Sequence, residues 1–428
     1  MNFVFHVDVN SAFLSWSAVK RLKEDPSAVD LRTIPSVVGG DEKTRHGIVT
    51  AKSLPAKKYG IHTADTIASA MKRCPNLTVV PADFATYRSY SKQFIRVLHT
   101  YSDAVEQASI DEAYVAIGAK DRDEAVRTAH AIKDEIRDSL GFTVNVGISV
   151  NKLLAKMASD FEKPDKVHTL FPEEVPKKMW PLPISELYGC GKKTSERLQS
   201  LGIRTIEDAA KADPAFLKSV LGEKSGAYIH SAANGIGSAI VETERDDRKS
   251  YSNERTTAED ITARNFRTAL PPFLKSLSEG VSSRLQKDQL RAGTLSVLVK
   301  TSEFQKRSIQ CPLPDPTNDG SIFYEQSLVL AGRLLAGNPD ALTKGKPVTG
   351  GLYETVSGIR LIGLKASDLT SDVYHQMTFE DLLQNQQKEQ EESARKKKLE
   401  KLKAMENAIR TKYGDGAIHR GSDDSGTT

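Results

Sequence analysis

Two adjacent carboxylates interrupt an apolar, strand-like run in the middle of this chain. The run is Ser109-Ile110-Asp111-Glu112-Ala113, and it continues into Tyr114-Val115-Ala116-Ile117. Successive side chains of a strand point to opposite faces, so both acids share one site only where the strand bends or ends. Buried paired acids lose several kcal/mol of hydration unless a partner compensates for the loss. A divalent cation such as Mg²⁺, which prefers oxygen ligands, is the obvious partner.

A second acid stands in the same kind of setting near the amino terminus. Asp8 comes at the end of another short apolar strand, Phe3-Val4-Phe5-His6-Val7. Each acid site alone is better explained as a strand-end carboxylate that caps a helix or turns a loop. Two strand-borne acid sites far apart in sequence instead favour one metal site built on neighbouring strands of a sheet.

The bulk composition limits the class of protein. A chain of 428 residues exceeds one typical core, so we expect about two to four domains. A net charge of +4 permits a nucleic-acid partner without proving one. Cys74, Cys190 and Cys311 lack metal-ligand spacing, which fits a reducing compartment. Because no apolar run is long enough to span a bilayer and no signal peptide is recognisable, we expect a cytoplasmic protein.

Strands and helices alternate through the first part of the chain. Apolar spacing predicts helices over residues 11–23, 66–72, 87–99, 122–140 and 151–161, with short strands between them. Ser149 or Asn151 is placed to cap the last of these helices. This alternation predicts an α/β or α+β domain up to residue 165.

A helical segment from Pro181 to about Gly235 follows. Its centre resembles a helix-hairpin-helix, in which backbone N–H groups at a glycine turn point toward a phosphate. The residues that would contact DNA there are Gly189, Gly191, Lys192 and Lys193. An ordinary helical hairpin, whose glycines only make the turn, is the alternative.

A third folded unit follows a polar linker around residues 242–252. Its apolar patterns predict the order β-α-β-β-α-β, which is that of a split βαβ unit. Basic residues along its strands would give the sheet a surface suited to phosphate contacts. These residues are Arg291, Lys300, Lys306, Arg307 and Arg360. A solvated charged face is the alternative.

Three motifs in one order resemble those of Y-family translesion DNA polymerases, closest to the bacterial DNA polymerase IV and UmuC-type branch. They are Asp8-Val9-Asn10-Ser11-Ala12-Phe13, Ser109-Ile110-Asp111-Glu112-Ala113-Tyr114 and the stretch from Gly147 to Asp165. The likeness covers about residues 1–370. It implies an α+β, multidomain, right-hand polymerase with a palm, small fingers, a helix-hairpin-helix thumb and a split βαβ little finger.

The resemblance also implies where these domains lie. Palm and fingers would occupy 1–166, with the fingers at about 14–78, and the thumb 167–238. A linker would follow at 239–252, then the little finger at 253–370. The tail, 371–428, would hold a charged helix and a disordered end.

The resemblance assigns roles to the acids. Nucleotidyl transfer needs two metal ions about 3.5–4 Å apart that clamp the attacking 3′-hydroxyl and the leaving pyrophosphate. By similarity, Asp8 and Asp111 would bridge both ions, Glu112 would bind the catalytic one, and the Val9 carbonyl would complete the nucleotide-side site. The ions would be Mg²⁺, with Mn²⁺ as a substitute.

Further positions would bind the nucleotide. Phe13 matches the steric gate that rejects a ribose 2′-hydroxyl, and Lys57 and Lys163 match positions that grip the triphosphate. Without the resemblance, a core aromatic and two surface lysines would be the simpler interpretation. The family often has Tyr and Arg where this chain has Leu54 and Lys57, so a hydroxyl and a bidentate guanidinium are missing there.

The tail carries a degenerate form of the peptide by which such polymerases dock on a sliding clamp. Gln376, Met377 and Phe379 would fill an apolar groove, although the usual Leu-Phe pair is missing.

Taken together, the resemblance predicts a low-fidelity, template-directed DNA polymerase that copies past damaged bases. Its partners would be primer-template DNA, deoxynucleoside triphosphates and a sliding clamp, and we expect a monomer. A non-catalytic DNA-binding scaffold with the same fold would be expected if an acid were lost, and none is. A nucleotide cyclase with a related palm is disfavoured by the hairpin glycines and the third unit.

Overall fold

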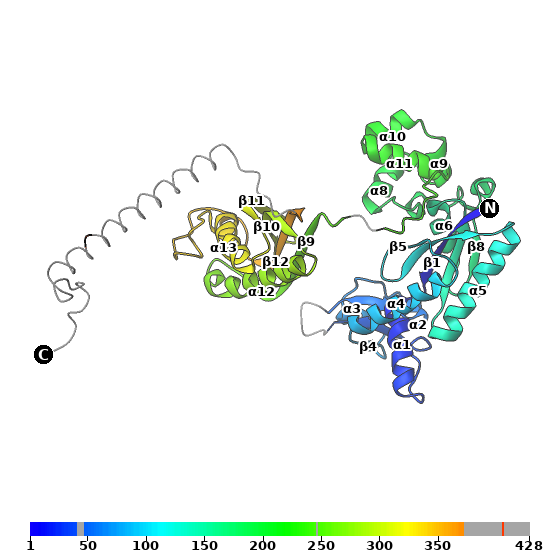
Figure 1. The fold of residues 1–428 in the computed structure, drawn as a ribbon, viewed down its shortest axis with the longest axis horizontal. Coiled ribbons are helices and arrows are strands. Elements are labelled where there is room, and N and C mark those ends of the chain that lie inside the picture. The colour runs from blue at the N-terminus through cyan, green and yellow to red at the C-terminus, as the bar shows by residue number, and fades with distance from the viewer. Residues whose placement is uncertain (41–46, 245–246, 372–404, 406–428) are drawn as a thin grey trace. The chain divides into compact units, whose positions relative to one another are not determined.

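The computed structural model describes residues 1–40, 47–244, 247–371 and 405, and these residues fall into two compact units (Figure 1). The first unit spans Met1–Asp247 and includes Thr256–Ala258; the second begins at Arg248 and holds the rest. Each unit is described separately below. Among the described residues, no helix is long and apolar enough to cross a membrane.

A five-stranded sheet forms the centre of the first unit. Its strand order is β5-β6-β1-β7-β8, with β1 antiparallel to both of its neighbours. The strands are β1 (Asn2–Val9), β5 (Val105–Gln107), β6 (Glu112–Gly118), β7 (Val144–Ser149) and β8 (Val167–Thr169). Every residue of β1 after Asn2 is buried, which explains why this central strand reads as a nearly continuous apolar run.

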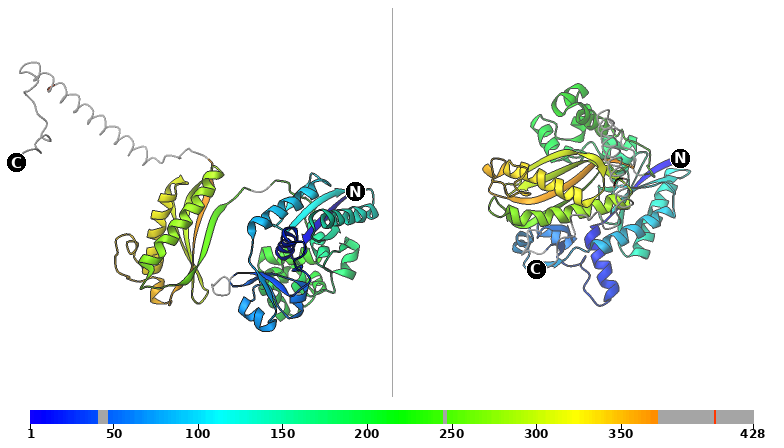
Figure 2. Two further views of the ribbon diagram at one scale, coloured as in Figure 1. Left: turned by 90° about the horizontal axis from the view of Figure 1, so that it is seen from below. Right: turned by 60° about the vertical axis from the view of Figure 1, so that its left-hand side comes forward.

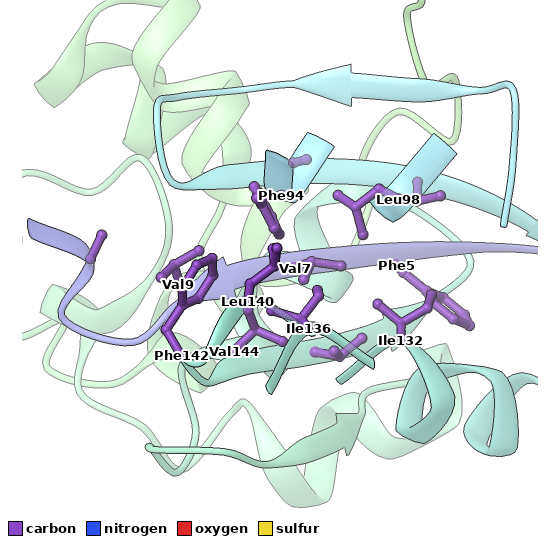
Figure 3. Close-up of a cluster of buried hydrophobic side chains, with 14 of the residues drawn as sticks. Phe5, Val7, Val9, Phe94, Leu98, Ile132, Ile136, Leu140, Phe142 and Val144 are labelled. Carbon is purple, nitrogen blue, oxygen red and sulfur yellow. The ribbon is translucent and has the colours of Figure 1, made fainter. Parts of the chain in front are cut away.

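The two faces of β1 meet different helices. Its odd-numbered side chains enter the main core with residues of α4 (Phe84–His99) and α5 (Arg122–Leu140). Figure 3 shows this core around Phe5, Val7 and Val9, with Phe94, Leu98, Ile132 and Ile136. Val4 instead clusters with Tyr114 and with Ala155 of α6 (Lys152–Ser159). Since strand side chains alternate, His6 and Asp8 also belong to the α6 face.

Local signals in the sequence fix the helix ends. The Asn151 side chain accepts the amide of Leu154 and caps α6, as one of the two predicted candidates. Asp121 caps α5, and Gly141 ends it in the left-handed conformation with φ 84°. The helix over 122–140 therefore has the predicted bounds.

Gly147 in β7 lies directly against α6. A Cβ built on it would lie 2.0 Å from the carbonyl oxygen of Ala155 and 2.4 Å from the amide nitrogen of Ser159.

We expect Gly147→Ala to lower the free energy of unfolding by about 1–3 kcal/mol, because α6 must shift to make room for the added methyl group. Urea denaturation measures the change. Gly118→Ala, where such a Cβ has no neighbour within 4 Å, should change it by less than about 0.5 kcal/mol. Equal effects of both substitutions would contradict this close approach.

A second, smaller sheet in this unit has the order β3-β2-β4. Its short strands are β2 (Ser36–Gly39), β3 (Val49–Lys52) and β4 (Thr78–Val80), packed with α2 (Leu54–Lys58) and α3 (Ile67–Arg73). Helix α1 (Ala12–Glu24) follows β1 directly. The α2 helix was not predicted; the Ser53 side chain caps it and Pro55 stands in its first turn.

The rest of the first unit is mainly helical. It comprises η1 (Pro172–Glu174), α7 (Val175–Lys178), η2 (Ile184–Glu186), α8 (Lys192–Ser200), α9 (Ile206–Lys211), α10 (Pro214–Leu221) and α11 (Glu223–Ala233). These elements share a core of their own with the apolar face of α6, including Leu153, Leu154 and Met157. The predicted helical segment is therefore confirmed.

The second unit has the predicted β-α-β-β-α-β order. Its elements are β9 (Ser250–Ile261), α12 (Phe266–Lys287), β10 (Arg291–Thr301), β11 (Lys306–Thr317), α13 (Gly320–Ala336), η3 (Leu352–Glu354) and β12 (Ile359–Thr370). The sheet order is β11-β10-β12-β9. Helices α12 and α13 pack together on the sheet (Figure 2).

Two strand predictions were wrong in extent. Residues 108–111, read as part of the acid-bearing strand, form a turn, and β6 begins at Glu112. Strand β11 continues seven residues past its predicted end at Gln310, through Pro312, Pro314 and Pro316, to Thr317. Prolines are tolerated there because β11 is an edge strand, where a missing backbone donor costs no ladder bond on the open side.

Candidate active site

Asp8 lies at the carboxyl end of β1, on the α6 face of the central sheet. Its side chain is buried, with 6% of the residue exposed. In the register of β1 and β6, Asp8 is directly opposite Glu112. The next backbone amide, that of Val9, donates to the carbonyl of Asp111 at 3.0 Å. Two acid sites about a hundred residues apart in sequence therefore meet at one strand end.

A serine holds the turn that carries the other two acids. The Ser109 hydroxyl donates to Asp111 Oδ1 at 2.6 Å and accepts the backbone amides of Asp111 and Glu112 at 3.2 and 3.1 Å. The strand starts only after this turn, so Asp111 lies in the turn and Glu112 is the first residue of β6. No property of Ser109 in the sequence marked it for this role except its place beside the acids.

Two lysines lie among the carboxylates. Lys156 Nζ is 2.8 Å from Glu112 Oε1, 3.3 Å from Asp160 Oδ2 and 4.0 Å from Asp8 Oδ2. Lys163 Nζ contacts Asp8 Oδ2 and lies 2.8 Å from Asp160 Oδ1. Burial raises the pKa of Asp8, and the charge of Lys163 opposes that rise. Burial would lower the pKa of Lys156, but the hydrogen bond to Glu112 and the charges of Asp8 and Asp160 raise it.

The donor set at this strand end suits a hard divalent cation. Its side-chain donors, on Asp8, Asp111 and Glu112, are carboxylate oxygens, which Mg²⁺ prefers. Across residues 1–40, 47–244, 247–371 and 405, no three His, Cys, Asp or Glu side chains are gathered closely enough to hold a metal. Instead, the ammonium groups of Lys156 and Lys163 supply the positive charge beside Glu112 and Asp8. Asp8 and Glu112 are thus each paired with an ammonium group, while the Asp111 carboxylate is bonded to Ser109.

His6 is a buried residue of this site that the sequence analysis did not select. Its Nδ1 lies 2.8 Å from the Ser159 hydroxyl, which itself donates to the carbonyl of Lys156, so His6 Nδ1 is the donor. Its Nε2 has no hydrogen-bond partner among the residues that the structure describes, and it lies 4.0 Å from Glu112 Oε2. Burial, with the charges of Lys156 and Lys163, lowers the pKa of His6, so the imidazole is neutral. Its place two residues before Asp8 was the available signal.

Phe13 belongs to an aromatic cluster at the start of α1. Its ring stacks on Tyr87 with centroids 4.7 Å apart and planes at 13°. Phe84 meets Phe13 edge-on at 5.9 Å, and Trp16 packs behind. Phe13 itself is only partly buried, while Tyr87 is fully buried. One face of the Phe13 ring is therefore covered by the stacked ring of Tyr87.

Lys57 and Lys163 line one cavity of about 210 Å³. Lys57 comes from α2 and Lys163 from the segment after α6, while Val9 to Ser11 form another part of the wall. Leu54, the residue that departs from the family pattern, also lines the cavity. The structure therefore brings the two predicted triphosphate ligands together beside Asp8.

Comparison with known proteins identifies the family. Residues 7–160 match the impB/mucB/samB family, 248–379 its C-terminal domain, and 172–203 the IMS family HHH motif. A DNA polymerase IV of Clostridium acetobutylicum is 38% identical over 418 residues, covering 97% of each chain. The chain belongs to the DNA polymerase IV branch of the Y family. It is a DNA-directed DNA polymerase.

Other relatives agree with this placement. DNA polymerase IV 1 of Bacillus subtilis is 31% identical over 423 residues, or 98% of this chain and 92% of that one. A solved Y-family DNA polymerase chimera shares the fold, with a TM-score of 0.70 at 23% identity over 86% of this chain and 98% of that chain. The predicted fold class, with its helix-hairpin-helix, is thereby confirmed.

In this DNA polymerase IV-type chain, the hairpin glycines lie between η2 and α8. Gly189 has φ 85°, and a Cβ there would lie 2.4 Å from the Tyr228 ring. Gly191 precedes α8 in open space, and the side chains of Lys192 and Lys193 are exposed. The first helix of the motif is a short 3₁₀ turn rather than an α-helix.

The basic residues of the second unit divide between its two faces. Lys300 lies opposite Lys306, and the cations of Lys300 and Arg360 are 5.1 and 4.9 Å from the centroid of the Phe304 ring. Arg307 lies opposite Val299, a core residue, so it belongs to the face that carries the helices, though it is exposed there.

Arg291 and the clamp-peptide residues are the remaining predicted site residues. Arg291 begins β10 and is partly buried. The clamp-peptide residues Gln376, Met377 and Phe379 lie outside the described residues.

Proposed function

We propose that this polymerase adds deoxynucleotides to a primer 3′ end through two divalent ions held by Asp8, Asp111 and Glu112. The observation that carries the proposal is the pairing of Asp8 with Glu112 across β1 and β6, with Asp111 bonded through its carbonyl to Val9. Bound Mg²⁺ or Mn²⁺ would supply Lewis-acid activation of the attacking hydroxyl and charge neutralisation of the leaving pyrophosphate. The Val9 carbonyl would be a further oxygen donor on the nucleotide side.

The chain's own groups prepare this site before the ions arrive. Ser109 fixes the Asp111 carboxylate, and Lys156 fixes that of Glu112. Such preorganisation lowers the reorganisation needed at the moment of reaction. Lys163, beside Asp8 and on the cavity wall, is placed to bind the triphosphate, with Lys57 across the same cavity.

Phe13 is the proposed steric gate. A sugar lying over the ring would meet a side chain that Tyr87 and Trp16 prevent from moving aside. A 2′-hydroxyl on that sugar would collide with the ring, so deoxynucleotides would be favoured.

Low fidelity and damage bypass are proposed from the size of the subdomain that follows α1. Its three strands are three or four residues long, and α2 has five residues. Two large hydrophobic side chains of this subdomain, Leu54 and Tyr59, are 52% and 50% exposed. A subdomain this small offers few side chains to enclose the new base pair, and damaged bases would be admitted for the same reason.

DNA would be held by two surfaces described separately above. These are the hairpin with Gly189, Gly191, Lys192 and Lys193, and the sheet face of the second unit with Arg291, Lys300, Lys306 and Arg360. Arg307 would contact phosphate from the strand edge. We further propose that residues 376–379 bind a sliding clamp. The protein would act as a monomer in the cytoplasm.

Primer extension across a damaged template tests this function. With Mg²⁺, the full chain should extend a primer on an undamaged template and also insert and continue past an abasic site. Addition of a chelator should stop both reactions. A primer that always ends opposite the abasic site would contradict bypass. DNA binding without any extension would favour the non-catalytic scaffold.

A further inference from the structure

The cavity that holds Lys57 and Lys163 has a third cation in its wall, Arg32. Its volume of about 210 Å³ equals the liquid volume of about seven water molecules. Small-molecule pockets usually measure about 300–1,000 Å³, so this one accepts part of a nucleotide rather than a whole one. Among the described residues that line it, none is acidic. Three cations around so small a space favour the entry of an anion.

The guanidinium of Arg32 is fixed before any ligand binds. Its Nε donates to Asp30 Oδ1 at 3.0 Å, its Nη2 to Asp30 Oδ2 at 2.8 Å, and its Nη1 to the carbonyl of Gly141 at 2.7 Å. A guanidinium has five N–H donors. These bonds use three of them, so two remain. A fixed fork loses little side-chain freedom when it binds a phosphate.

Positive charge around the cavity is not fully neutralised. The Asp30 carboxylate offsets Arg32, and Asp8 and Asp160 offset Lys163, but Lys57 has no ion-pair partner among the described residues. Burial, and after it the charge of Lys57, lowers the pKa of neighbouring Lys52. The cavity therefore carries a net positive potential that favours an anion.

We propose that Arg32 binds the terminal phosphate of the incoming nucleotide and supplies the bidentate fork that Leu54 and Lys57 do not provide. Leu54 has no donor, and Lys57 is a point charge, whereas a guanidinium matches two phosphate oxygens at once. The inference rests on the proposed nucleotide site beside Asp8. It adds a specific ligand from the segment that joins α1 to β2.

A purely structural role is the competing explanation for Arg32. Its pair with Asp30 is partly exposed, at 34% and 25% of the two side chains, and such pairs contribute little to stability. The tie to Gly141 accounts for one N–H only. Neither contact requires the guanidinium to face a cavity that two lysines also line.

Single-nucleotide incorporation by the full chain tests the proposal, with dATP varied opposite a template thymine. Arg32→Gln should raise the KM for dATP about 10-fold or more, as expected for a lost charge-assisted hydrogen bond. kcat should change little, since ground state and transition state lose the same contact. Arg32→Lys should recover part of the loss, and the KM for primer-template should stay unchanged. Inorganic tripolyphosphate should compete with dATP less well in Arg32→Gln.

Two control variants separate binding from structure. Asp30→Asn breaks the same ion pair but keeps the guanidinium, so its KM for dATP should rise far less than that of Arg32→Gln. Leu54→Tyr with Lys57→Arg should restore a low KM in the Arg32→Gln background. An unchanged KM for dATP in Arg32→Gln, or equal rises for dATP and primer-template, would overturn the proposal. Loss of extension in the wild type would instead refute the proposed function.

Discussion

Asp111→Asn should reduce the rate of nucleotide incorporation by about 1,000-fold or more. A metal ion contributes several kcal/mol to stabilising the transition state, and each 1.36 kcal/mol corresponds to about tenfold in rate. The amide keeps the size of the side chain and can still bond to Ser109, but it lacks the charge that would bind two cations. Rapid-quench measurement of single-nucleotide incorporation with saturating Mg²⁺ and dATP gives the rate directly.

Asp123→Asn is the matched control for that substitution. Asp123 is exposed in the first turn of α5 and is remote in the fold from the acid cluster on β1 and β6. Its rate should stay within twofold of the wild type, about 0.4 kcal/mol. If Asp111→Asn retains wild-type incorporation while its thermal unfolding and DNA binding are normal, the assignment of the acids is wrong.

Phe13→Ala should lower discrimination against ribonucleotides by about 100-fold, a size typical of rejecting one added hydroxyl. The ring stacks on Tyr87, so removal leaves an open space where the 2′-hydroxyl would otherwise collide. The ratio of kcat/KM for dATP and ATP measures the effect. Most of the change should come from faster use of ATP, while incorporation of dATP falls modestly.

Phe84→Ala tests whether the effect belongs to the gate or to the aromatic cluster as a whole. Phe84 makes T-shaped contacts with both Phe13 and Tyr87 and is 52% exposed. Its loss should leave the dATP-to-ATP ratio within about threefold of the wild type, because a surface aromatic contributes little to the position of Phe13. Similar losses of discrimination in both variants would refute the gate.

Much of the architecture was predictable because local and global signals agree. The 19-residue helix α5 has an Asp cap, a regular apolar face and a closing glycine, and its predicted bounds are those of the structure. The second unit's element order followed from alternating and helical periodicities. Strand β11 was predicted too short, because prolines argue against strands except at a sheet edge, and edge position is a tertiary property.

The site was predictable only in part, for a similar reason. Asp8, Asp111 and Glu112 stood out because acids in apolar strands need a partner. Lys156 did not, since a lysine in a helix is usually solvated; only the packing of α6 against β1 and β7 buries it beside Glu112. Arg32 had no signal, because its nearness to Lys57 depends on how the loop after α1 folds.

Counting the divalent ions bound to a stalled complex tests the central claim most directly. The full chain, a dideoxy-terminated primer-template and dATP would be titrated with Mn²⁺, and free Mn²⁺ followed by electron paramagnetic resonance. We predict about two protein-dependent ions per wild-type complex, as two-metal nucleotidyl transfer requires, and fewer with Asp111→Asn. Equal numbers of bound ions in the two proteins would contradict the central claim that Asp111 is a shared ligand of the two catalytic metals.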